Sequence, residues 1–321
     1  MAVEMIPEEL CRELRDVLIA AVERNLGDTI LLSGGLDSSI IALLASKMGD
    51  LKAISICLKD SPCDDLKYAR IVADFLDIEH LILLFDLDEL EEGIRETIRV
   101  LKTFDPMEVR NSAAIYMALR YARDIGGELI MTGDGGDELF AGYSFLYNLS
   151  LDELDLKIRR LWRRMSFSSV KLGEALGMEV RQPYLDREVM SFAERLDSRF
   201  RVGFRDGRRY GKYILRVAFE DQLPDEIVWR VKVPIEGGCG TSTLPKIFED
   251  DIKDFEELRE RYFIEDGVRI RSQEQLFYYQ IYRSLFSPPH PDGSTGKICP
   301  MCHSNVSEDA THCRVCGAYP I

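Results

Sequence analysis

Hydrophobic and polar positions follow two different periods in the first 150 residues. After Pro7, apolar residues recur at helical spacing from Leu10 to Val22, which predicts a first helix. Short apolar runs follow, separated by helical patterns such as 65–76 and 88–101. The runs cover residues 29–32, 51–57, 80–85 and 128–131. This alternation predicts an α/β fold, with a parallel sheet between helices and ligands bound beyond the carboxyl ends of the strands.

The pattern changes in the second half of the chain. Beyond about residue 150 the strand signal fades and amphipathic helices dominate, as at 212–219 and 273–285. Proline, glycine and serine then gather in a short stretch that indicates a linker, and four cysteines crowd into the end of the chain. We therefore predict one large domain over 1–286 (sheet part about 25–150, helical part about 151–286), a linker at 287–296 and a small module at 297–321.

Composition narrows the class of protein. With 321 residues, 46% hydrophobic and 30% charged, the chain has the composition of an ordinary globular protein of about two domains. A net charge of −15 argues against bulk coating of nucleic acid, because the whole molecule repels phosphate backbones. No apolar run approaches the roughly 18 residues of a membrane span. Glu4, Glu8 and Glu9 occupy the start in place of a basic and apolar secretory signal, so we expect a cytoplasmic protein.

The first predicted strand leads into the sequence SGGLDSS at residues 33–39, and an apolar helix pattern follows at once. Two glycines let the backbone approach an anion, while N–H groups at the helix start and the hydroxyls of Ser33, Ser38 and Ser39 can donate hydrogen bonds to it. The Gly-Lys-Ser/Thr ending of kinase-type loops is absent, and Asp37 suits a magnesium ion held against pyrophosphate. The pattern predicts a pyrophosphate-binding loop. A glycine turn capped by serines is the alternative.

A second glycine-rich stretch, TGDGGDELFAGY at residues 132–143, follows the fourth predicted strand. It carries Asp134, Asp137 and Glu138 among its glycines. At the end of a parallel strand these acids would lie near Asp37, where carboxylates can hold magnesium or act as a base. A solvated glycine loop is the competing interpretation, since acids are common in turns.

These two stretches, with EVRQPYLD at 179–186, YILR at 213–216 and WRVK at 229–232, resemble the synthetase domain of the asparagine synthetase B family over roughly residues 5–244. The order and spacing of the motifs agree with that family. The resemblance implies an adenine nucleotide alpha hydrolase-like fold of the PP-loop ATP pyrophosphatase superfamily. It also implies an AMP-forming ligase of asparagine biosynthesis, in which ATP adenylates a carboxylate, aspartate or a related acid, and ammonia or an amine then attacks.

The resemblance also implies roles for individual residues. Pyrophosphate would be held by Ser33, Gly34, Gly35, Ser38 and Ser39, and adenosine by Leu31, Ile56, Thr132 and Gly133. Asp37 and Asp137 would place magnesium where negative charge is greatest. Lys212 and Lys232 match family lysines near the phosphates, and Lys232 is the better candidate to stabilise developing charge.

Further polar residues are candidates for the substrate. Asp134 stands where some family members carry glutamate, and it could orient or deprotonate the incoming amine, with Glu138 close by in the same loop. Arg110 and Arg181 could clamp a substrate carboxylate or a phosphate, because a guanidinium group binds two such oxygens at once. Surface salt bridges are an equally good explanation for both arginines.

The sequence departs from the family in two places. The usual N-terminal glutaminase domain has a cysteine after the initiator methionine, whereas this chain has Ala2 and its synthetase motifs begin within 33 residues. We therefore expect no glutaminase domain here, and nitrogen from free ammonia, a separate glutaminase subunit or an amine substrate. The stretch VPIEGGCG at 233–240 is only loosely similar to the family, near where the acceptor is expected.

The terminal module carries two C-x-x-C pairs, Cys299 with Cys302 and Cys313 with Cys316. Four thiolates complete a tetrahedral zinc site, and with no open position the zinc would be structural. The neighbouring His303 and His312 could replace a ligand, and a redox dithiol pair is a weaker alternative.

Such a zinc ribbon could contact RNA or a protein partner. A basic patch could add to that contact; its residues are Arg159, Arg160, Arg163 and Arg164 around Trp162. A solvated helix face explains the same arginines.

Three functions remain from the sequence. The first is an ATP-dependent amide ligase similar to asparagine synthetase. The second is a nucleotide- or tRNA-modifying PP-loop ligase with the zinc ribbon as its RNA-binding module. The third is a catalytically silent regulator that binds ATP, which the retained set of Asp37, Asp134, Asp137 and Lys232 argues against.

Overall fold

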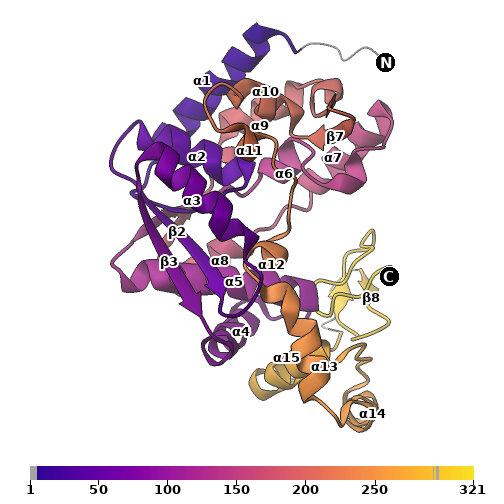
Figure 1. The fold of residues 1–321 in the computed structure, drawn as a ribbon. Helices are drawn as coiled ribbons and strands as arrows, with labels where there is room; N and C mark the ends of the chain where they lie inside the picture. Colours follow the sequence, from indigo (N-terminus) through magenta and orange to yellow (C-terminus); the bar gives the residue numbers. More distant parts are fainter. Residues whose placement is uncertain (1–5, 292, 294–295) are drawn as a thin grey trace. The chain divides into compact units, whose positions relative to one another are not determined.

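A computed structural model describes residues 6–291, 293 and 296–321 (Figure 1). Glu4 and Ala2, and linker residues 292, 294 and 295, lie outside the described residues. The chain forms two compact units, which are described separately. Unit 1 comprises 1–56, 63–83 and 118–234, and unit 2 comprises 57–62, 84–117 and 235–321.

The sheet has five strands in the order β3-β2-β1-β4-β5. The strands are β1 (Thr29–Leu31), β2 (Lys52–Leu58), β3 (Glu79–Phe85), β4 (Leu129–Met131) and β5 (Glu179–Arg181). β1 pairs in parallel with both β2 and β4, and β4 pairs in parallel with β5. The loops that follow β1 and β4 therefore leave the same edge of the sheet. This topology confirms the predicted parallel α/β fold.

Helices of unit 1 pack on β1 and on one another. They are α1 (Glu8–Arg24), α2 (Leu36–Ser46), α3 (Asp64–Leu76), α6 (Gly136–Leu139), α7 (Leu151–Trp162), α8 (Ser168–Ala175), α9 (Arg187–Arg195), α10 (Tyr213–Phe219) and α11 (Asp225–Val228). α2 is apolar on nearly all sides and is buried along most of its length, so it fills the core beside Leu18 of α1 and Ile30 of β1.

Three strands correct the prediction that the second half is helical throughout. β5 extends the sheet, and β6 (Val202–Arg205) pairs with β7 (Arg208–Gly211) as an antiparallel hairpin. Asp206 and Gly207 form its turn with φ angles of +48° and +80°, the backbone that a tight hairpin requires. An Asp-Gly pair is a sequence signal for a hairpin, and it was not used in the prediction of a helical second half.

Unit 2 is mainly helical. Its elements are α4 (Leu87–Leu101), the start of α5 (Pro106–Asp124), α12 (Ile235–Gly238), α13 (Leu244–Asp251), α14 (Phe255–Asp266), α15 (Gln273–Leu285), β8 (Lys297–Ile298) and β9 (Asn305–Val306). α15 lies at its centre, and Phe104 packs edge-on against Tyr279 and Tyr282, with ring centroids 4.8 and 5.2 Å apart. Among the described residues, no helix is both long and apolar enough to cross a membrane.

Candidate active site

The loop after β1 turns sharply at a glycine. Gly34 has φ +63°, and a Cβ at this position would lie 2.3 Å from the backbone nitrogen of Ala69, so only glycine fits. The hydroxyls of Ser38 and Ser39 donate to the carbonyl of Gly35 at 3.2 and 2.7 Å. The Ser33 hydroxyl accepts from the amide of Gly35 at 3.2 Å. These bonds fix the predicted phosphate loop at the N-terminus of α2, where backbone N–H groups favour an anion.

The loop after β4 lies against this first loop. A Cβ on Gly136 would be 2.5 Å from Asp37 Oδ1, and one on Gly133 would be 2.9 Å from the backbone nitrogen of Ser38. Glycine at both positions is therefore what allows the two loops to touch. The structure brings Asp37 and the acidic stretch 134–138 together at one edge of the sheet.

Two lysines and two aspartates form a compact ionic cluster in unit 1. Lys212 Nζ binds Asp37 Oδ2, and it lies 2.6 Å from Asp137 Oδ1. Lys232 Nζ lies 2.7 Å from the other oxygen of Asp137. The side chain of Lys212 is 4% exposed and that of Lys232 is 36% exposed, so solvent reaches the cluster from the Lys232 side.

The position of Lys212 depends on a close backbone contact. Lys212 is the N-cap residue of α10, with φ +54°, and its amide donates to the carbonyl of Phe140 at 2.8 Å. A Cβ on the preceding Gly211 would lie 1.9 Å from the carbonyl oxygen of Ala141, and one on Gly142 would lie 1.8 Å from Asp137 Oδ1. Gly211 and Gly142 therefore let the segment of Lys212 pack directly on the turn after Asp137.

Burial and ion pairing together set the protonation of the cluster. Burial raises the pKa of Asp137, but Lys212 and Lys232 outweigh it and hold that pKa below its usual range. For Asp37, burial is the largest influence and raises the pKa against the attraction of Lys212. Asp37 Oδ1 is also buried with no hydrogen-bond partner among the described residues. A buried carboxylate oxygen left free in this way is a donor that Mg²⁺ prefers.

Asp134 points into a separate hydrogen-bond network. Its Oδ2 accepts from Thr132 Oγ1 at 2.9 Å, from Ser169 Oγ at 2.6 Å and from Gln182 Nε2 at 3.0 Å. Three donors on one oxygen hold the carboxylate in a single orientation. Glu138 is held differently: burial raises its pKa, while the hydroxyl of Tyr143 donates to it and lowers that pKa.

The residues expected around adenosine lie at the ends of neighbouring strands. Leu31 ends β1 and Ile56 lies near the end of β2, and both are partly exposed. Thr132 and Gly133 follow β4. Thr132 is buried, and its hydroxyl donates a hydrogen bond to Asp134. The four positions thus surround the start of the phosphate loop.

The two candidate substrate arginines occupy ion pairs. Arg181 is half-buried at the end of β5, and its Nε lies 2.6 Å from the exposed carboxylate of Glu179. Arg110 belongs to unit 2, where it lies 2.9 Å from Glu236 and 3.4 Å from Glu274. Both side chains therefore have carboxylate partners within their own unit.

Arg230, which the sequence interpretation did not select, supports the phosphate loop. Its guanidinium donates to the carbonyl of Ser33 at 2.9 Å and to Asp65 at 2.6 Å, and it lies 4.0 Å from the ring centroid of Tyr68. The residue is part of the WRVK motif, which was the available signal. An arginine that binds a loop carbonyl 197 positions away leaves no periodic pattern in the sequence.

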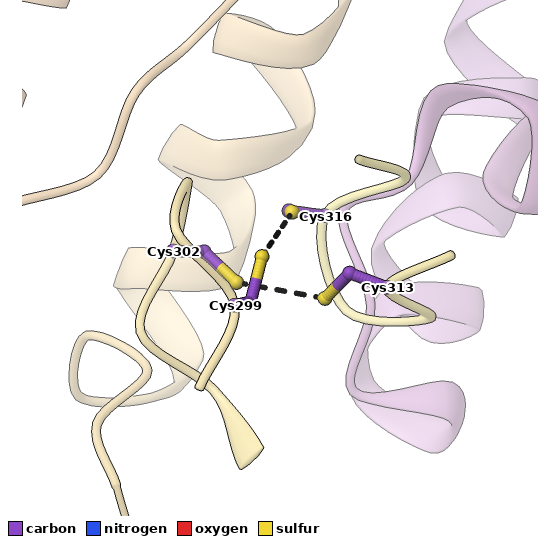
Figure 2. A group of neighbouring side chains, drawn as sticks. All are labelled: Cys299, Cys302, Cys313 and Cys316. Atoms are coloured by element: carbon purple, nitrogen blue, oxygen red, sulfur yellow. Dashed lines mark hydrogen bonds between the residues drawn. The ribbon is translucent and has the colours of Figure 1, made fainter. Parts of the chain in front are cut away.

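The four terminal cysteines of unit 2 point toward one another (Figure 2). Their sulfur atoms all lie within 4.8 Å, with Cys299 3.7 Å from Cys316 and Cys302 3.7 Å from Cys313. A tetrahedral zinc with Zn–S bonds of about 2.3 Å separates its sulfurs by about 3.8 Å, so the cluster fits that ion.

The histidines beside the cysteine cluster are engaged elsewhere in unit 2. His303 Nε2 lies 3.1 Å from the carbonyl of Gly267, and His312 Nε2 lies 3.0 Å from Asp105. The second cysteine pair is bound to the helical part of the unit, since Gln275 and Arg271 both donate to the carbonyl of Cys316 at 2.7 Å. The cysteine-bearing segment thus packs on α15 within unit 2.

A parallel sheet with a glycine loop after β1, and an acidic glycine loop after the neighbouring β4, defines the class of α/β domain whose site lies at the carboxyl ends of its strands. Within that class, the chain belongs to the asparagine synthase family, whose model matches residues 13–173 and 156–294.

Three relatives illustrate the extent of the similarity. A probable asparagine synthetase (glutamine-hydrolyzing) of Dictyostelium discoideum is 31% identical over 315 residues, covering 87% of this chain and 54% of the relative. The asparagine synthetase of Zea mays is 30% identical, with 88% and 51% covered, and asparagine synthetase B of Escherichia coli is 29% identical, with 86% and 54% covered. The chain therefore spans about half the length of these relatives.

Proposed function

We propose that the chain is an ATP-dependent, AMP-forming amide ligase. A carboxylate oxygen of the substrate attacks the α-phosphorus of ATP, the bond to the β-phosphate breaks, and pyrophosphate leaves. Ammonia or an amine then attacks the acyl carbon, loses a proton and expels AMP. The observation that carries this proposal is the cluster of Lys212, Lys232, Asp37 and Asp137 beside the glycine loop, because it concentrates cations and metal-binding oxygens where pyrophosphate would form.

Magnesium is the metal that suits this site. Asp37 and Asp137 would hold it, and the free buried oxygen of Asp37 supports that assignment. When bound with ATP, the ion would neutralise charge on the phosphates and orient them. The loop of residues 33–39 would hold the pyrophosphate group through its backbone N–H groups.

Lys232 and Asp134 would act at different steps. Lys232 is the more exposed of the two lysines and would stabilise the charge that develops on the leaving pyrophosphate. Asp134 would orient the attacking amine and accept its proton, because Thr132, Ser169 and Gln182 hold its carboxylate in place.

Aspartate or a related acid is the proposed acyl substrate, and ammonia or an amine the nitrogen donor. The names of the relatives describe asparagine synthetases that hydrolyse glutamine. Ammonia could be free or come from a separate glutaminase subunit. The cysteine cluster would hold a structural Zn²⁺, and reduced thiolates of this kind are typical of the cytoplasm.

The test is ATP–pyrophosphate exchange with magnesium, using aspartate first and then a panel of carboxylates. We expect exchange in the wild type, its loss in Asp37→Ala, and a large fall to a rate that is still measurable in Lys232→Ala. Lys246→Ala is the matched control, because this lysine side chain is 70% exposed on unit 2. Exchange that appears only when RNA is added would favour the nucleic-acid-modifying ligase, and ATP binding without exchange under any condition would refute the ligase.

A further inference from the structure

The two lysines of the cluster come from segments that the fold does not otherwise join through a strand or helix. Lys212 is the N-cap residue directly before α10, while Lys232 lies in the irregular stretch 230–234 after α11. Both nevertheless contact the same carboxylate, at 2.6 and 2.7 Å from the two oxygens of Asp137. Some other contact must keep this irregular stretch in register with the start of α10.

Arg216 of α10 makes that contact. Its Nε donates to the carbonyl of Gly211, at 2.9 Å, which directly precedes Lys212. Its Nη1 donates to the carbonyls of Val228 and Arg230, the latter at 3.1 Å and two residues before Lys232. One guanidinium thus joins both lysine-bearing segments.

The surroundings of Arg216 hold its guanidinium in this position. The residue is only 3% exposed, and its guanidinium carbon lies 5.0 Å from the ring centroid of Tyr210 and 5.8 Å from that of Trp229. Burial lowers the pKa of Arg216, and the nearby Asp37 and Asp137 favour its charged form. A cation buried this deeply depends on every hydrogen bond it makes, so its geometry is closely fixed.

We propose that Arg216 is a positioning residue that keeps Lys212 and Lys232 in register on Asp137, so that both ammonium groups meet the leaving pyrophosphate together. This inference rests on the proposed ligase activity. Lysine cannot replace Arg216, because a single ammonium group lacks the planar fork that reaches carbonyls on both segments.

The first experiment is a double-mutant cycle between Arg216→Lys and Lys232→Met, measured by ATP–pyrophosphate exchange. We expect Arg216→Lys to lower the exchange rate by about 100-fold with little change in the KM for ATP, because a misplaced group is costly mainly in the transition state. In the Lys232→Met background the same change should lower the rate by less than about 3-fold. An undiminished effect in that background would overturn the proposal.

Arg201→Lys is the matched control for loss of a buried arginine. Arg201 is 2% exposed, and its guanidinium donates to the carbonyl of Leu196 at 2.7 Å, to Ser198 Oγ at 3.0 Å and to the carbonyl of Leu139 at 3.2 Å, which all lie outside the segments 211–212 and 228–232. We expect both substitutions to lower the melting temperature. For Arg201→Lys, however, any loss of rate should persist in the Lys232→Met background.

One further variant decides the case if Arg216→Lys does not fold or the wild type shows no ATP–pyrophosphate exchange. A glycine inserted after Val231, which is exposed, separates Lys232 from its anchored segment without touching Arg216. Amide hydrogen exchange in this variant needs no activity: we expect protection to be kept at both 211–212 and 228–230, because Arg216 still donates to the carbonyls of Gly211, Val228 and Arg230. Loss of protection at 228–230 in the variant would overturn the anchoring role of Arg216. If the wild type shows no ATP–pyrophosphate exchange, the proposed ligase activity is refuted, while the anchoring role of Arg216 is judged by amide hydrogen exchange.

Discussion

Removal of zinc should loosen a defined part of unit 2. The second cysteine pair presents backbone carbonyls to the helical part of the unit. Gln275 and Arg271 donate to Cys316, and the amide of Phe104 donates to Val315 at 2.8 Å. The hydroxyl of Thr103 adds a bond to the carbonyl of Arg314, also at 2.8 Å. These bonds exist only while the cysteine loops keep their shape, which a module of this size holds through its metal.

The size of the effect follows from the bonds that are lost. At about 1 kcal/mol each, the four hydrogen bonds contribute about 4 kcal/mol. Leaving the buried amide of Gln275 without its acceptor adds about 1–3 kcal/mol. Because a domain is stable by only about 5–15 kcal/mol in total, loss of zinc should bring unit 2 close to unfolding.

The assay is hydrogen exchange with and without a zinc chelator, after metal analysis that should find one zinc per chain. We expect protection to fall at residues 103–105 and 271–275 and to remain in α2 of unit 1. Cys313→Ser should reproduce the loss, whereas Cys11→Ser, which changes a buried cysteine of α1, should not. Unchanged protection at 103–105 after complete removal of zinc would refute the reasoning.

Three further predictions concern single residues. Burial raises the pKa of Glu274 to about 7, so ionisation of this carboxyl group destabilises the folded state as the pH rises from about 4.5 to 7. Glu274→Gln should therefore raise the free energy of unfolding by up to about 3 kcal/mol at pH 8. At pH 4 it should have little effect, and urea unfolding at the two pH values measures the difference. Gly142→Ala should abolish pyrophosphate exchange, because its Cβ would overlap Asp137 Oδ1. Gln182→Leu removes a donor to Asp134 and should slow amide formation about 10-fold while leaving exchange unchanged, which single-turnover assays of the two steps would separate.

Elements marked by a helical period or an apolar run were predictable from the sequence, and β5 was not. The pattern of 273–285 matches α15 at both ends, since polar Ser272 caps a helix with one apolar face. β5 is as short as β1 and β4, but its residues Glu179–Arg181 include two charged side chains and form no apolar run, and its place in the sheet comes from pairing with β4. Tertiary pairing, rather than local preference, makes this segment a strand.

The same distinction holds within the candidate site. The two glycine loops could be predicted from the sequence because only glycine fits where a neighbouring segment comes very close to the backbone, as at Gly34 and Gly136. The partners of Arg110 could not be predicted from the sequence, because Glu236 and Glu274 lie 126 and 164 residues further along the chain. Charged residues at such separations pair through the fold, and nothing local in the sequence identifies which pairs form.

The cluster at the centre of the site links these observations to the proposed chemistry. Two aspartates and two lysines cancel in charge, which lets Lys212 and Asp137 be buried before any ligand arrives. Binding of a magnesium–ATP complex would bring both positive and negative charge, so the aspartates could turn to the metal while the lysines turn to the phosphates. Such an exchange of partners needs ammonium groups that are already in position, and this is the requirement that the bonds of Arg216 to both segments would meet.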